Sequence, residues 1–63
     1  MKYSELERII KKMTNSRFHR HGRRHPIWYN PDTNEFFEMS RHKNEEVAKG
    51  TLNDILIKSG VKK

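Results

Sequence analysis

The chain has 63 residues, which allows one small domain over residues 1–63 with a marginal hydrophobic core. It holds 14 Lys and Arg against 8 Asp and Glu, a net charge of +6, with 32% hydrophobic residues and no cysteine. These totals exclude a disulfide-stapled scaffold, and no stretch is long enough to span a bilayer. We expect a soluble cytoplasmic protein without a signal peptide, whose charge favours a polyanionic partner, either nucleic acid or a membrane surface.

A capping signal opens the first predicted helix. In Ser4-Glu5-Leu6-Glu7, the Ser4 hydroxyl is placed to accept from the Glu7 amide, and the Glu7 carboxylate to accept from the Ser4 amide. Apolar side chains then follow at helical spacing, at Leu6, Ile9, Ile10 and Met13. The pattern predicts a helix over about residues 5–13, which Thr14-Asn15-Ser16 ends.

The middle of the chain predicts three short strands. Residues 17–20 fit a strand that turns only Phe18 inward, and a turn follows at Gly22. The next strand is Pro26-Ile27-Trp28-Tyr29, with the proline first because it lacks an amide hydrogen. Residues 30–34 form a turn with proline at its first central position, and residues 35–39 form the third strand, so that the last two strands make a hairpin.

The last part of the chain predicts a loop and a second helix. Residues 40–50 are polar and indicate an ordered loop. Thr51 is the expected helix cap, together with Asp54, and Gly60 suits the left-handed position that ends a helix. The side chains expected to face the core are Leu52, Ile55 and Leu56. The order predicts an α+β domain in which two helices cover one face of a three-stranded antiparallel sheet.

The stretch from Arg17 to His25 holds four arginines and three histidines in nine residues. One interpretation is a solvated charged face, and the other, which we favour, is a surface that binds RNA phosphates. A third interpretation is a zinc or nickel site made by His19, His21 and His25, since the first two share a face on a regular strand. The neighbouring arginines would repel a cation, so we expect no metal and no other cofactor.

Several motifs together have a familiar arrangement. Lys49-Gly50-Thr51-Leu52-Asn53-Asp54-Ile55-Leu56 follows Arg41-His42 and precedes Ser59-Gly60-Val61. Upstream, Gly22, His25 and Trp28 give a glycine, a histidine and an aromatic residue in order. The chain resembles the HicA family of toxins over nearly its whole length. It departs from the family by placing two residues, Arg23 and Arg24, between the glycine and the histidine, where the family usually has one.

This resemblance implies an αβββα fold like that of a double-stranded-RNA-binding domain. It also implies a metal-independent endoribonuclease, an mRNA interferase that a HicB-type antitoxin neutralises in a heterotetramer or larger complex. His25 is then the expected catalytic residue, because a free imidazole titrates near neutral pH and transfers protons readily. Without the resemblance, a surface histidine in a basic loop is the simpler interpretation. The second catalytic group stays open among His21, Tyr29 and His42.

The expected RNA contacts combine the basic stretch with later residues, and they are Arg20, Arg23, Arg24, Arg41, Lys49 and Trp28. Lys49 precedes a helix, so it either binds phosphate or merely flanks the cap. About half of the aromatic side chains should be core, and the others should meet RNA or a partner protein. Two other functions remain open, a non-catalytic RNA-binding module and a small partner-binding protein.

Overall fold

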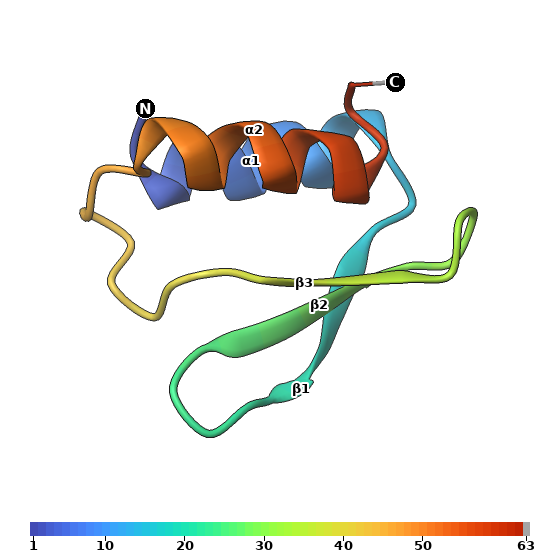
Figure 1. Cartoon of the computed structure of the whole chain (residues 1–63), viewed down its shortest axis with the longest axis horizontal. Coiled ribbons are helices and arrows are strands. Elements are labelled where there is room, and N and C mark those ends of the chain that lie inside the picture. Colours follow the sequence, from blue (N-terminus) through green and yellow to red (C-terminus); the bar gives the residue numbers. More distant parts are fainter. Residues whose placement is uncertain (63) are drawn as a thin grey trace.

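The computed structural model describes residues 1–62, in which two helices lie over a three-stranded sheet (Figure 1). In chain order the elements are α1 (Tyr3–Met13), β1 (Arg17–His21), β2 (Pro26–Asn30), β3 (Glu35–Glu38) and α2 (Lys49–Ser59). The sheet is antiparallel, with the order β1-β2-β3. This confirms the predicted αβββα order and an α+β fold like that of a double-stranded-RNA-binding domain.

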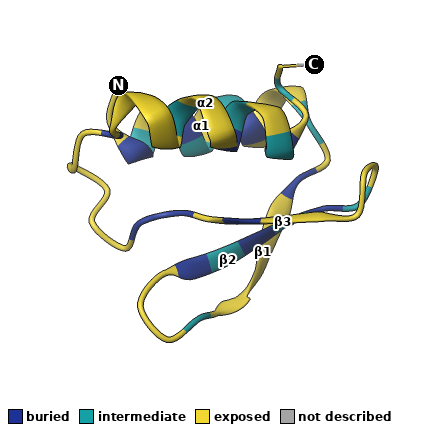
Figure 2. Ribbon diagram, in the orientation of Figure 1, coloured by how far each residue is buried: buried dark blue, intermediate teal, exposed yellow. Residues whose placement is uncertain are grey.

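The core lies between the helices and the sheet face turned toward them, here called the inner face (Figure 2). Its buried apolar residues are Tyr3, Leu6, Ile10, Trp28, Phe37, Met39, Val47 and Ile55. Trp28 and Phe37 are opposite each other in the sheet and both point inward. Their neighbours Tyr29 and Phe36 are also opposite each other, and strand alternation turns them to the other side, the outer face.

The cap predicted at Ser4 is wrong, because α1 begins one residue before it. The N-cap is Lys2, whose backbone amide donates to Glu5 Oε1 at 3.4 Å. The Ser4 amide instead donates to the carbonyl of Lys43, and the Tyr3 amide to the carbonyl of Glu45. The loop before α2 therefore satisfies the amides that a local cap would have served.

The cap predicted at Thr51 is also wrong. The N-cap of α2 is Ala48, so Thr51 and Asp54 lie within the helix, where Asp54 forms an ion pair with Lys58 at 3.2 Å. At the other end Gly60 has φ 94°, as predicted for a left-handed helix end, and its amide donates to a carbonyl of the last turn.

The strand β1 contains a β-bulge that the sequence did not reveal. Phe18 is opposite Trp28 while Arg20 is opposite Ile27, so His19 is an extra residue without a partner across the sheet. Every residue of β1 is exposed. Phe18, predicted to face inward into the core, points to the inner face but stays 45% exposed because α2 packs over β2 and β3 and leaves this edge strand open.

Candidate nucleic-acid interface and active site

The turn between β1 and β2 carries His25 just before β2 begins. The Gly22 amide donates to the His25 carbonyl at 3.0 Å and closes the turn. A Cβ atom at Gly22 would lie 2.6 Å from that carbonyl oxygen and 3.0 Å from the Ile27 side chain, so only glycine fits. The side chains of Arg23, Arg24 and His25 are all exposed. A tight turn thus presents two guanidinium groups and an imidazole to solvent.

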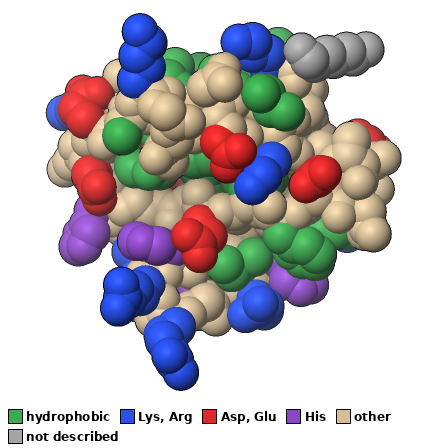
Figure 3. All heavy atoms as spheres, viewed as in Figure 1, with side chains coloured by type: hydrophobic (Ala, Val, Ile, Leu, Met, Phe, Trp, Pro, Cys, Tyr) green, Lys and Arg blue, Asp and Glu red, His purple; other side chains and the backbone are tan. Residues whose placement is uncertain are grey.

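Arg41 joins this turn from a distant part of the chain. The Met39 amide donates to the Pro26 carbonyl at 3.0 Å, which continues the pairing of the hairpin past the end of β3. This brings Arg41 beside the turn, where its Nη2 donates to the Gly22 carbonyl at 3.2 Å. Figure 3 shows Lys, Arg and His side chains gathered below the helices on this face of the molecule. We call Arg23, Arg24, His25 and Arg41 the basic turn.

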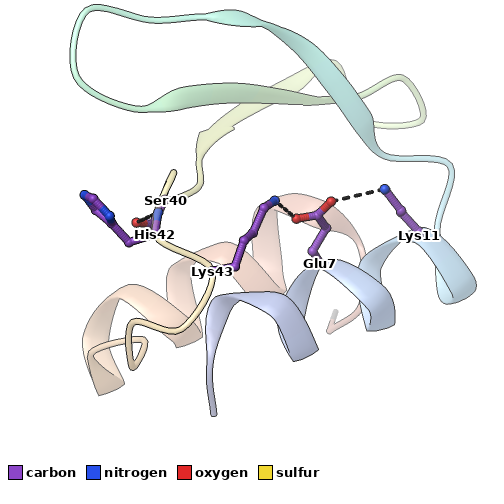
Figure 4. Close-up of polar contacts among 5 residues, drawn as sticks. All are labelled: Glu7, Lys11, Ser40, His42 and Lys43. Atoms are coloured by element: carbon purple, nitrogen blue, oxygen red, sulfur yellow. Dashed lines mark hydrogen bonds and ion pairs between the residues drawn. The ribbon is translucent and has the colours of Figure 1, made fainter.

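The positive charge of the basic turn has no internal partner. In residues 1–62, the ion pairs involve lysines and the N-terminal amine, and none involves an arginine. Lys43 and Lys11 both bind the Glu7 carboxylate, as Figure 4 shows. Lys11 and Lys43 therefore share one carboxylate, while the arginines of the turn stay open to an anion.

A groove of about 300 Å³ opens between α1 and the inner face next to the basic turn. Its walls include His21 and Arg41 near the turn, with Lys43 and Glu7 along α1 and Phe18 at the edge of β1. The His42 imidazole, in contrast, points away from the Glu7 cluster in Figure 4, and its backbone amide donates to Ser40 Oγ at 3.0 Å. Of these two histidines, only His21 shares the groove with Arg41.

The other predicted RNA contacts are dispersed. Arg20 is exposed on β1, and Lys49 is exposed at the first residue of α2, in the helix layer. Trp28 is only 3% exposed, because it faces the helices, and Lys11 Nζ lies 5.7 Å from the centre of its ring. The prediction that Trp28 contacts RNA is therefore wrong, since a buried ring offers no face to a base.

The bulge at His19 also overturns the predicted geometry of the histidines. The His19 ring lies on the outer face, 5.3 Å from the Phe36 ring, whereas the His21 ring lies on the inner face, 4.9 Å from the Phe18 ring. The two side chains do not share a face, because the extra residue breaks the alternation. Within residues 1–62, no three His, Cys, Asp or Glu side chains are grouped to hold a metal ion.

Sequence reasoning missed a cluster of rings on the outer face, formed by His19, Tyr29 and Phe36. Alternation along the hairpin was enough to place Tyr29 and Phe36 together. Alternation from the inward Phe18 also turns His19 outward, whereas the faces of Arg20 and His21 depend on the bulge, for which the local sequence gives no signal.

The fold and the basic turn define a small protein like a double-stranded-RNA-binding domain, with an exposed histidine among arginines. None of the helices in the described chain is long and apolar enough to cross a membrane. The family model of the HicA toxin of bacterial toxin–antitoxin systems matches residues 3–61. The chain therefore belongs to the HicA toxin family and is a toxin of a toxin–antitoxin system, as the resemblance indicated. No curated protein and no solved structure matches it.

Proposed function

We propose that this HicA-family toxin is an endoribonuclease that cuts messenger RNA, with His25 as its catalytic residue. The observation that carries the proposal is the basic turn, in which an exposed imidazole stands among three exposed guanidinium groups. Cleavage of RNA requires proton transfer beside a bound phosphate, and these are the two kinds of side chain that the reaction uses.

The chemistry follows from the RNA itself, which carries its own nucleophile. His25 accepts the proton of a 2′-hydroxyl as its oxygen attacks the adjacent phosphorus, and the bond to the 5′-oxygen breaks as that oxygen gains a proton. Arg23, Arg24 and Arg41 hold the phosphate and offset the charge that develops on it. The products are a 2′,3′-cyclic phosphate and a 5′-hydroxyl. The route requires no metal or other cofactor, and DNA resists because it lacks the hydroxyl.

His21 is the best placed of the three candidates for the second catalytic group. It is opposite Pro26 in the sheet and lines the groove that Arg41 also lines. The Tyr29 hydroxyl is instead bonded to Asn34 at the other end of β2. We therefore assign His21 as the group that gives the proton to the 5′-oxygen of an RNA strand bound at the turn.

The partner that neutralises the toxin is proposed to be a HicB-type antitoxin, in a heterotetramer or larger complex. Because the arginines of the basic turn have no carboxylate partners in residues 1–62, acidic side chains of an antitoxin complement them directly. Such a partner would cover His25 and exclude RNA. A complex that left His25 open to solvent would contradict this mode of inhibition.

Induced expression tests the proposed function in cells. We expect the wild-type chain to arrest growth and degrade transcripts, and His25→Ala to do neither. Lys12→Ala is the control, because this exposed lysine belongs to the last turn of α1 and not to the basic turn. Its effect should equal that of the wild type. If His25→Ala still degraded transcripts, or if the wild-type chain bound RNA and left it intact, the toxin would not be the proposed ribonuclease.

A further inference from the structure

The outer face of the sheet carries three rings that the basic turn does not use. The centres of the Tyr29 and Phe36 rings are 4.8 Å apart, and the His19 ring lies 5.3 Å from Phe36 and 5.9 Å from Tyr29. Both helices lie on the other side of the sheet, so neither covers these rings (Figure 1). We call His19, Tyr29 and Phe36 the outer platform.

The outer platform is exposed at His19 and Phe36, half-buried at Tyr29, and held in place. Phe36 is 48% exposed, whereas its neighbour Phe37 is 3% exposed in the core. Phe36 and Tyr29 are fixed opposite each other in the sheet, and the Tyr29 hydroxyl is bonded to Asn34. Phe36 thus presents an aromatic ring to water at a position that the sheet fixes, where a stacking ligand can cover it.

Guanidinium groups border the outer platform. Arg17 is opposite Tyr29 and Arg20 is opposite Ile27, so both arginines belong to the same face as the rings. Glu38, the last residue of β3, is an acidic residue on this face and is also opposite Ile27. Rings with arginines beside them are typical of surfaces that bind single-stranded nucleic acid, where bases stack on the rings and phosphates pair with the cations.

A hollow of about 800 Å³ extends the outer platform toward α2. Its walls include His19 and Phe36 on the outer side, and Phe37 of the core with Asp54 and Ile55 of α2 on the inner side. This volume lies within the range of roughly 300–1,000 Å³ that is usual for small-ligand sites. The hollow therefore runs from the rings around the edge of the sheet at β3 to α2, with room for a base or sugar beside the rings.

We propose that the outer platform stacks unpaired bases of single-stranded RNA, so that the substrate of the toxin is single-stranded where it contacts the sheet. The proposal rests on the proposed function for the identity of the RNA as substrate. A duplex hides the faces of its bases, and therefore cannot use the rings. The outer platform would therefore recognise single-stranded RNA, whereas the overall fold alone suggests recognition of a double strand.

The test measures RNA binding in the His25→Ala background, which keeps the RNA intact. The probe is a ten-nucleotide single-stranded RNA that carries 2-aminopurine, whose fluorescence is quenched when it stacks. Phe36→Leu keeps an apolar side chain but removes the ring. We expect binding that is roughly 5- to 100-fold weaker, with loss of the quenching, and recovery of both in Phe36→Trp. In a fully paired duplex of the same sequence the 2-aminopurine is already stacked, so binding should cause no further quenching, and Phe36→Leu should cause no loss of affinity.

Two further variants make the test independent of folding. His19→Ala removes an exposed side chain and should weaken binding in the same direction as Phe36→Leu. Ile57→Ala is the matched control, because Ile57 is 49% exposed on α2, nearly the exposure of Phe36. It should bind as tightly as the His25→Ala parent. Thermal unfolding of each variant verifies that the fold is retained.

The outcomes separate this proposal from the proposed function. Unchanged affinity and quenching in both Phe36→Leu and His19→Ala would overturn the outer platform, even if cleavage depended on His25. Loss of antitoxin binding with RNA affinity unchanged would also overturn it and assign the face to a protein. Cleavage that persisted in His25→Ala would instead overturn the proposed function, while a loss of base stacking in Phe36→Leu would still support the platform.

Discussion

Arg41 donates a hydrogen bond from Nη2 to the carbonyl oxygen of Gly22 at 3.2 Å, and this bond ties the segment after β3 to the turn that presents His25. The Gly22 amide in turn donates to the carbonyl of His25. The backbone of Gly22 is therefore hydrogen-bonded both to the guanidinium group of Arg41 and to the carbonyl of His25. Because a guanidinium has five N–H donors, Arg41 keeps others for a phosphate after this contact is made.

Arg41→Ala should weaken RNA binding and slow cleavage with little loss of stability. The variant removes one phosphate contact, so the slope of log affinity against log salt should fall by about 1. The lost bond is exposed and should change the free energy of unfolding by less than about 1 kcal/mol. Binding titrations at several salt concentrations measure the slope. Arg8→Ala, an equal charge change on α1, should leave the slope unchanged, and an equal effect of both variants would refute a specific contact by Arg41.

Gly22→Ala should impair cleavage although it leaves every candidate catalytic side chain in place. A Cβ atom there would meet the His25 carbonyl at 2.6 Å, so the turn has to open. We expect a loss of about 1–3 kcal/mol in the free energy of unfolding together with a loss of activity. Gly50→Ala is the matched control, since a Cβ atom there meets nothing within 4 Å, and an alanine in α2 should be neutral or slightly stabilising. Equal activity of the two variants would show that the turn geometry does not matter.

The ion pairs of Glu7 should make stability depend on acid pH. Partial burial raises the pKa of this carboxyl, but hydrogen bonds from Lys43 and then Lys11 outweigh burial and lower the pKa below its ordinary value of 4.5. The folded state therefore binds this proton less readily than the unfolded state. The stabilisation is fully present above about pH 4.5 and is lost as the pH falls through the lowered pKa of the folded state.

Glu7→Gln tests this dependence. We expect it to destabilise the protein by about 1 kcal/mol at neutral pH and to flatten the decline of stability in acid. Denaturant unfolding measures both effects between about pH 3 and about pH 7, a range that spans the pH of roughly 4–5 at which free carboxyls titrate. Glu35→Gln, which replaces an exposed carboxylate in β3, should leave the profile unchanged. A parallel profile for Glu7→Gln and the wild type would contradict the role of these ion pairs.

Asn30→Ala should destabilise the contact between the β2–β3 hairpin and the end of α2. The Asn30 side chain is buried, with Nδ2 donating to the Lys58 carbonyl at 3.1 Å and Oδ1 accepting from the Asp32 amide at 3.0 Å. Removal of both bonds leaves buried polar groups unpaired, at a cost of about 1–3 kcal/mol. Thermal unfolding measures the loss. The exposed variant Asn53→Ala should cost less, and equal losses would contradict a buried role for Asn30.

The order of elements was predictable because local signals agree with the fold. The apolar spacing in α1, the proline at the start of β2 and Gly60 at the end of α2 are each satisfied by short-range geometry. The caps at Ser4 and Thr51 were not predictable in the same way. Carbonyls of Lys43 and Glu45, about 40 residues away, take the amides at the start of α1, and no local motif reveals such a competition.

The candidate site likewise combines residues that local sequence places with residues that long-range pairing places. Arg23, Arg24 and His25 are neighbours in sequence, so a turn at Gly22 was enough to place them together. Arg41 reaches the turn only through the pairing of β3 with β2, which a single sequence indicates weakly. The bulge in β1 changes the register after His19, so that Arg20 joins the outer face and His21 the inner face, and this is a property of the assembled sheet.

Purified protein and a single-stranded RNA substrate test whether His25 moves a proton while the RNA attacks its own phosphate. We expect products ending in 2′,3′-cyclic phosphate and 5′-hydroxyl, and a rate that falls by about 10²- to 10⁴-fold in His25→Ala while RNA affinity changes little. A substrate with 2′-deoxyribose at the cleaved position should resist. Wild-type rates in His25→Ala, or cleavage of the deoxy substrate, would show that His25 does not act on the 2′-hydroxyl.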